Sequence, residues 1–130
     1  MGRPRSRSVV LDAGALLALE KRDRRMEALL RKAHQVRAKV IIPAGVLAQV
    51  WSGDASQAPL HRLLRRSSTD VPALDRVLAE AVGRLCRRSG TTDVVDASVV
   101  IAARRASAIV VTSDPADLRS LDPALAIAAI

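Results

Sequence analysis

The sequence predicts an α/β protein whose mainly parallel central sheet is covered by helices on both faces, a three-layer α/β/α sandwich. Two observations lead to this fold class. Short apolar runs alternate with segments of helical periodicity along the whole chain, which is the order that βαβ units produce. The apolar runs are continuous, which is typical of strands buried on both faces of a parallel sheet. In such a sheet the ligand site lies beyond the carboxyl ends of the strands.

Strands are predicted where a short apolar run is bounded by polar residues, Pro or Gly. The run SVVLD (8–12) ends in an Asp, and KVII (39–42) is stopped by Pro43. The predicted strands are 8–12, 39–42, 108–112 and 124–130, with a further short one within 70–74. This spacing leaves room for a helical connection between successive strands, which parallel pairing requires.

Helices are predicted where apolar residues recur at three- and four-residue spacing. Most of the segment 13–35 is predicted to be amphipathic helix, because its apolar residues from Met26 to Val36 follow this spacing. The segment 74–90 places its apolar residues on one face and ends at Gly90, a typical helix stop. The one-face residues are Leu74, Val77, Leu78, Ala81, Val82 and Leu85. Shorter helices are predicted at 44–51, 60–66, 93–107 and 115–121, with a loop at 52–59.

Length and composition indicate a single domain spanning residues 1–130, in which residues 1–7 form a flexible basic N-terminal segment. The apolar fraction of 49% and the charged fraction of 26% are those of a globular protein. No apolar run reaches the about 18 residues of a membrane span, and Asp12 interrupts the only signal-like stretch. The single cysteine, Cys86, excludes an internal disulfide and is expected to be a small buried residue on a helix. We therefore expect a reduced, cytoplasmic protein.

The charge is unevenly distributed. The net charge is +8, yet residues 91–130 carry three basic and five acidic side chains. The positive net charge suggests a polyanionic partner, although a contribution to solubility alone is a second explanation of this charge. With no Phe, no Tyr and one Trp, the chain does not suit modules that stack single-stranded RNA on exposed aromatics, and Trp51 is expected to pack near a groove. The arginines on predicted helices are either phosphate contacts or a solvated face: Arg62, Arg65, Arg66, Arg84, Arg87 and Arg88.

Aspartates gather where the predicted strands end. Asp12 ends the first strand, Asp114 follows the strand at 108–112, and Asp117 lies one helical turn later. Asp93 and Asp96 open the helix at 93–107, again three residues apart, so that each pair shares a helix face. We therefore expect Asp12, Asp96, Asp114 and Asp117 to converge at one edge of the sheet.

Each aspartate also has a purely local explanation. Asp12, Asp93 and Asp114 suit N-caps, while Asp96 and Asp117 suit the acidic third residue of a capping box. Taken together, the carboxylates repel one another unless protons or a cation intervene. A hard divalent cation such as Mg²⁺ prefers oxygen ligands, and such a centre serves phosphodiester hydrolysis. The two histidines, His34 and His61, are expected to be surface residues and not ligands.

Four stretches resemble, in order and spacing, the motifs of PIN-domain ribonucleases, and most nearly those of the VapC toxins of bacterial type II toxin–antitoxin pairs. They are VVLDAGALLAL, IIPAGVLAQVW, DVVDASVVIAA and VVTSDPADL, and together they extend over nearly the whole chain. The resemblance implies a PIN-like fold and a Mg²⁺- or Mn²⁺-dependent endoribonuclease that cleaves RNA. It also implies a homodimer, and an inhibitory VapB-type antitoxin whose C-terminal segment lies across the active site.

By the same resemblance, the first acidic position of the family is Asp12, the position opening the small-apolar helix is Asp96, and the last two are Asp114 and Asp117. We expect Asp12, Asp96 and Asp114 to hold the metal, with Asp117 completing the acidic pocket. Asp93 is an additional ligand or only a cap, and Ser113 is a further candidate.

One position departs from the family pattern. The family usually has a Glu on the helix after the second strand, whereas this chain has Gln49, and Asp54 lies too far along to replace it. A glutamine cannot ionise, so it is a weaker metal ligand and cannot act as a base. A second hypothesis is therefore a catalytically impaired PIN-fold protein that only binds RNA or its antitoxin. A third, a phospho-acceptor signalling domain, lacks the late lysine it needs, because no Lys follows Lys39.

Overall fold

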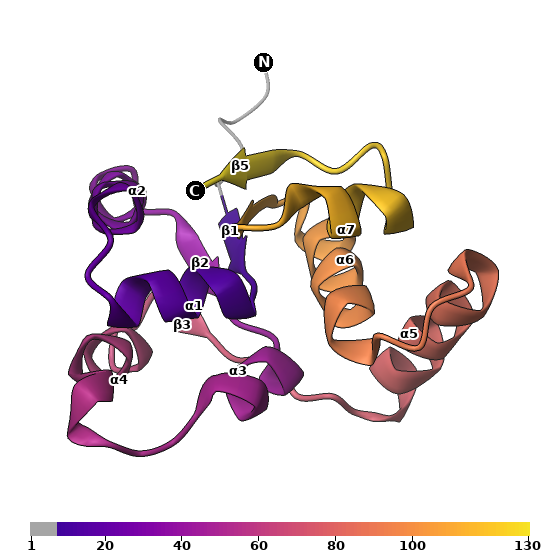
Figure 1. The fold of residues 1–130 in the computed structure, drawn as a ribbon, viewed down its shortest axis with the longest axis horizontal. Coiled ribbons are helices and arrows are strands. Elements are labelled where there is room, and N and C mark those ends of the chain that lie inside the picture. Colours follow the sequence, from indigo (N-terminus) through magenta and orange to yellow (C-terminus); the bar gives the residue numbers. More distant parts are fainter. Residues whose placement is uncertain (1–7) are drawn as a thin grey trace.

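The sheet of the computed structural model has five strands, all parallel, and confirms the predicted fold class (Figure 1). The structure describes residues 8–130, so the predicted basic segment 1–7 lies outside the described residues. The strands are β1 (Ser8–Leu11), β2 (Lys39–Ile41), β3 (Thr69–Asp70), β4 (Ile109–Thr112) and β5 (Ile127–Ala129). They are arranged in the order β3-β2-β1-β4-β5, so the two longest strands, β1 and β4, lie side by side near the centre.

Helices cover both faces of the sheet. On one side α1 packs against α2, α3 and α4, and on the other α6 packs between α5 and α7 (Figure 1). The helices are α1 (Ala13–Glu20), α2 (Arg24–Gln35), α3 (Ala44–Val50), α4 (Ala58–Leu64), α5 (Arg76–Ser89), α6 (Val94–Ala106) and α7 (Pro115–Leu121). A 3-10 turn, η1 (Ala55–Gln57), precedes α4. Within residues 8–130 no helix is long and apolar enough to cross a membrane.

The core is centred on β1 and β4. Val10, Leu11, Val110 and Val111 are fully buried between the two helical layers, which explains why these strands are apolar without alternation. Because α1 leaves β1 and α7 leaves β4 at the same edge, this packing brings two strand–helix junctions together.

The segment predicted as one amphipathic stretch, 13–35, is two helices. Arg22 adopts a left-handed conformation with φ of 56°, and the chain turns sharply between α1 and α2. Asp23 then caps α2, accepting a hydrogen bond of 2.9 Å from the backbone N–H of Met26. The apolar stripe that predicts the helix resumes at Met26 and conceals this break.

The fifth helix starts later than predicted. It begins at Arg76 behind the cap Asp75, so Leu74 precedes it and is 49% exposed. Val77 is 64% exposed and does not share the buried face, which is formed by Leu78, Val82, Leu85 and Cys86. The expectation that Cys86 is a small buried residue on a helix is confirmed.

Candidate active site

The carboxyl ends of β1 and β4 form one edge of the sheet. Leu11 pairs with Val111, and the backbone N–H of Asp12 donates to the carbonyl of Val111 over 3.3 Å. Asp12 therefore lies directly beside Thr112, the last residue of β4. Parallel strands bring their carboxyl ends to the same edge, as expected from the sequence.

Asp12 is a buried carboxylate, 8% exposed, that also caps α1. Its Oδ1 accepts a hydrogen bond of 2.9 Å from the backbone N–H of Ala15. Burial raises the pKa of Asp12 above 3.8, and the negative charge of Asp114 raises it further. Hydrogen bonds from the Thr112 hydroxyl and from backbone N–H groups oppose this rise in pKa. The cap and the predicted site are thus the same side chain.

Thr112 links two of the aspartates and was not identified from the sequence. It is completely buried, and its hydroxyl accepts the backbone N–H of Asp114 over 2.9 Å while hydrogen-bonding the side chain of Asp12. A polar residue ending an apolar strand directly before Asp114 was the signal that could have identified it. Thr112 fixes the position of the two strand ends relative to each other.

The beginning of α6 contributes two more carboxylates. Asp93 caps the helix and accepts a hydrogen bond of 2.9 Å from the backbone N–H of Asp96. The half-buried Asp96 has its pKa raised from 3.8 to about 6, first by burial and then by the charge of Asp93. The charges of Asp117 and Asp12 raise the pKa of Asp96 further. Asp96 therefore lies within electrostatic reach of Asp93 on its own helix and of carboxylates on two other segments.

The beginning of α7 completes the group. Asp114 occupies the N-cap position, but its side chain makes no capping hydrogen bond. The exposed Asp117 shares a hydrogen bond with Asp114, and this bond together with the charge of Asp114 raises the pKa of Asp117. We call these five residues the acidic cluster: Asp12, Asp93, Asp96, Asp114 and Asp117.

A glycine allows the two strand–helix junctions to meet. A Cβ at Gly14 would collide with the hydroxyl of Ser113 and would lie 3.5 Å from Oδ1 of Asp12. Ser113 therefore lies against the first turn of α1, at the border of the acidic cluster. A side chain at position 14 would force the Ser113 hydroxyl to move away.

Gln49 is an exposed residue of α3. The first turn of α3 packs on α6, where a Cβ at Gly45 would lie 3.8 Å from Val95, and Gln49, four residues further along, lies on the same face of α3 as Gly45. Asp54 is also exposed, in the loop after α3. His34 is exposed and His61 is half-buried, and neither contributes to the pKa shifts of the acidic cluster.

The candidate arginines lie on two helices. Arg62, Arg65 and Arg66, on or just after α4, belong to the same helical layer as α1 and α3. Arg84, Arg87 and Arg88 are exposed on α5 in the opposite layer.

The acidic cluster offers only oxygen donors, which suits a hard divalent cation. Within residues 8–130 no three His, Cys, Asp or Glu side chains are grouped tightly enough to enclose a metal ion. Mg²⁺ does not need such a cage, because it usually keeps several waters and takes one or two carboxylates together with substrate phosphates. The raised pKa values of Asp12, Asp96 and Asp117 reflect a crowding of negative charge that a cation would relieve. The donor set thus fits a hydrated Mg²⁺ or Mn²⁺ ion.

Comparison with known proteins identifies the fold. No family model and no curated protein sequence matches the chain. The structure of FitAcB from Neisseria gonorrhoeae matches with a TM-score of 0.61 and 17% identity, over 92% of this chain and 95% of that one. The structure of FitAB bound to an IR36 DNA fragment has a TM-score of 0.62 and 15% identity, over 93% and 94%. VapBC2 from Rickettsia felis, bound to a promoter DNA fragment, has a TM-score of 0.70 and 18% identity, over 94% and 98%. The chain therefore has the PIN-like fold of these proteins.

Proposed function

We propose that this protein is a metal-dependent endoribonuclease and the toxin of a VapBC-type toxin–antitoxin pair. The observation that carries the proposal is the acidic cluster, which gathers five carboxylates at the ligand-binding edge of the sheet in a chain of net charge +8. The shared fold with the toxin–antitoxin proteins FitAB and VapBC2 supports the family assignment.

Each residue of the site has its own proposed role. Asp12, Asp96 and Asp114 would hold a hydrated Mg²⁺ or Mn²⁺ ion, one or two of them directly and the rest through its waters, and Asp117 would maintain the negative potential around them. When bound, the metal supplies Lewis acidity that activates water and offsets charge on the scissile phosphate. Thr112 holds the strand ends in place through its hydroxyl. The arginines of α4 would attract the RNA backbone.

Cleavage of RNA by the purified protein tests the proposal. We expect Mg²⁺- or Mn²⁺-dependent cleavage that EDTA stops and that Asp12→Asn lowers by more than about 100-fold. Glu80→Gln is the matched control, because it removes an exposed carboxylate that pairs with Arg76 on α5. Cleavage that persists in EDTA, or is unchanged in Asp12→Asn, would contradict a metal mechanism at this site.

A second candidate function is an RNA- or antitoxin-binding protein with impaired catalysis. The observation that favours it is Gln49, an uncharged residue where the resembling family has a Glu. Gln49→Glu separates the two functions. If Gln49→Glu cleaves RNA and the unmodified protein does not, the result favours the impaired binding protein. If the unmodified protein already cleaves RNA, the result favours the nuclease.

The proposed partners follow from the same assignment. We expect a VapB-like antitoxin to bind the protein and inhibit cleavage, and the protein to form a homodimer. Co-expression with any short reading frame that adjoins the gene, followed by affinity capture and size-exclusion chromatography with light scattering, tests both. A monomer that captures no such product would contradict this assignment.

A further inference from the structure

The side chain of Trp51, the only tryptophan of the chain, is partly exposed to solvent. Trp51 follows α3 and is 46% exposed, although the sequence predicts that it packs near a groove. Its ring lies 4.7 Å from the ring of His61 on α4, at an interplanar angle of 53°. Two neighbouring rings, one of them open to solvent, form a surface on which a flat aromatic group can stack.

A buried glutamine fixes the loop that presents this ring. Gln57 is 2% exposed, and its Oε1 accepts the backbone N–H groups of Ser52 over 2.9 Å and of Gly53 over 3.0 Å. Its Nε2 donates to the carbonyl of Val50 over 2.8 Å. These bonds close the chain on both sides of Trp51. The exposure of Trp51 is therefore built into the fold of the loop.

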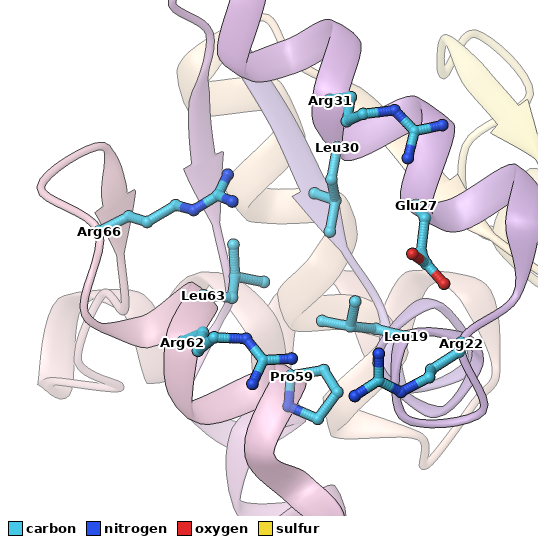
Figure 2. A pocket seen from close by; sticks show the side chains of 9 residues that line it. All are labelled: Leu19, Arg22, Glu27, Leu30, Arg31, Pro59, Arg62, Leu63 and Arg66. Atoms are coloured by element: carbon cyan, nitrogen blue, oxygen red, sulfur yellow. The ribbon is translucent and has the colours of Figure 1, made fainter.

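Arginines continue from this aromatic pair along α4. Arg62 and Arg65 line a hollow of about 400 Å³ beside His61. Arg62 also lines a second cavity, of about 200 Å³, between α1, α2 and α4. Figure 2 shows the guanidinium groups of Arg22 and Arg62 turned toward this second cavity from the two sides of Pro59. One arginine thus connects the two hollows.

The charged side chains that line the second cavity are mostly positive. Arg22, Arg31, Arg62 and Arg66 surround it, and Glu27 is the only acid in its lining (Figure 2). Within residues 8–130 none of these four arginines forms an ion pair with a carboxylate. Several unneutralised guanidinium groups around one hollow repel one another unless an anion lies between them. The planar guanidinium fork is suited to phosphate, which it binds with two parallel hydrogen bonds.

We propose that this surface, the α4 groove, is a subsite for single-stranded RNA. One base stacks on Trp51 beside His61, and backbone phosphates of the adjoining nucleotides bind the arginines of the two hollows. The α4 groove is defined by Trp51, His61, Arg65, Arg62, Arg66, Arg22 and Arg31. The RNA as substrate rests on the proposed function.

The chemistry of the α4 groove favours a nucleic acid over an acidic protein. A stacking ring followed by a line of cations matches the alternation of base and phosphate, and this combination is the usual one for single strands. Its place in the fold also fits a substrate. The seven residues of α3 span about 10 Å between the contact with α6, where Asp96 lies, and Trp51. The strand would thus leave the acidic cluster and follow α3 to the α4 groove.

Binding of an RNA octamer in EDTA tests the subsite without relying on cleavage. Because Trp51 is the only tryptophan, its fluorescence reports stacking directly. We expect the octamer to quench this emission, and Trp51→Leu to weaken binding about tenfold in fluorescence anisotropy with a labelled octamer. Arg22→Gln/Arg66→Gln should lower the slope of log affinity against log salt by about 1.4. The control Arg76→Gln/Arg105→Gln removes two exposed arginines of α5 and α6, in the other helical layer, and should leave the quenching unchanged.

The outcomes separate this inference from the proposed function. Octamer binding without quenching, or with an affinity that Trp51→Leu leaves unchanged, would overturn the subsite. So would an acidic peptide that quenches Trp51 with the same arginine dependence while RNA does not, because the α4 groove would then serve a protein partner. If the protein shows quenching but never cleaves RNA, the subsite stands and the nuclease fails. If it cleaves and both groove variants keep the unmodified KM, the nuclease stands and the subsite fails.

Discussion

Replacing Asp96 by Asn should stabilise the metal-free protein at alkaline pH. The folded protein raises the pKa of this carboxyl from 3.8 to about 6, because the group is half-buried and faces other carboxylates. A group with a raised folded pKa contributes stability below its unfolded pKa, and this contribution is lost as the pH rises through the folded pKa. Above pH 6 the charged Asp96 therefore opposes folding. Asn removes the charge, while the backbone N–H at position 96 still reaches the cap Asp93.

The magnitude follows from the shift. A rise from 3.8 to about 6 corresponds to about 3 kcal/mol if none of it is screened. Because much of the Asp96 side chain remains in contact with water, we expect screening to leave about 1 kcal/mol. For a chain of this length, that corresponds to an increase in Tm of about 4 °C.

Thermal unfolding in EDTA, followed by circular dichroism at pH 8 and at pH 4, measures the effect. We expect Asp96→Asn to melt higher than the unmodified protein at pH 8 and at the same temperature at pH 4. Asp122→Asn is a control of opposite sign, because the hydrogen bond with Arg104 lowers the pKa of Asp122. That variant should be less stable at pH 8, and the loss should shrink as the pH falls through the folded pKa. An Asp96→Asn protein that gains nothing at pH 8, or gains equally at pH 4, would refute the reasoning.

Three further predictions concern other parts of the site and its surroundings. Mg²⁺ or Mn²⁺ at 100 times its dissociation constant should stabilise the unmodified protein by about 2.7 kcal/mol, and a thermal melt should show no such rise for Asp12→Asn. Gly14→Ala should displace the hydroxyl of Ser113 and lower the free energy of unfolding in urea by about 1–3 kcal/mol, and Gly14→Ala/Ser113→Ala should recover part of this loss. Equal stability of the unmodified protein and the two variants would contradict the close contact. Gln57→Leu should lower the free energy of unfolding by about 2–3 kcal/mol, because it leaves Glu20 and three backbone groups without their hydrogen-bond partner. It should also shift the emission of Trp51, and an unchanged urea midpoint would contradict the structural role of the Gln57 amide.

The sheet and the acidic cluster could be predicted because both follow from short-range pattern and topology. Continuous apolar runs specify buried parallel strands, and parallel strands place the residues that follow them at one edge. The location of Asp12 and Asp114 at this edge could be predicted from their position directly after such runs. The location of Asp96 and Asp117 could be predicted from helix periodicity, which places residues three positions apart on one face.

Features that depend on tertiary packing were not predictable in this way. The arginine cavity joins Arg22, from the turn after α1, to Arg62 and Arg66, about forty residues later, and no local pattern connects them. The exposure of Trp51 depends on a buried amide six residues further along. The break at Arg22 is hidden because the apolar stripe resumes on the next helix, whose start depends on the single cap Asp23.

The cap and metal explanations of the aspartates are not alternatives in this structure. Asp12 and Asp93 use one carboxylate oxygen each for a helix N-terminus, which fixes the direction of the side chain. Asp114 occupies a cap position without making the bond, so its carboxylate remains available although its location is fixed. Helix caps thus place negative charge where a cation would bind, and the helix dipoles partly offset the repulsion.

The position of Gln49 limits what the missing carboxylate can mean. Gln49 is exposed and lies one turn beyond the contact between α3 and α6, so a Glu there would add charge at the margin of the acidic cluster. An exposed charge at such a margin contributes at most about 1 kcal/mol, or about fivefold in affinity. The Mg²⁺ dissociation constant obtained from the rise in Tm with Mg²⁺ concentration should therefore differ by less than about fivefold between Gln49→Glu and the unmodified protein. A response to Mg²⁺ confined to the variant would instead make position 49 a metal ligand, and the unmodified chain the impaired binding protein.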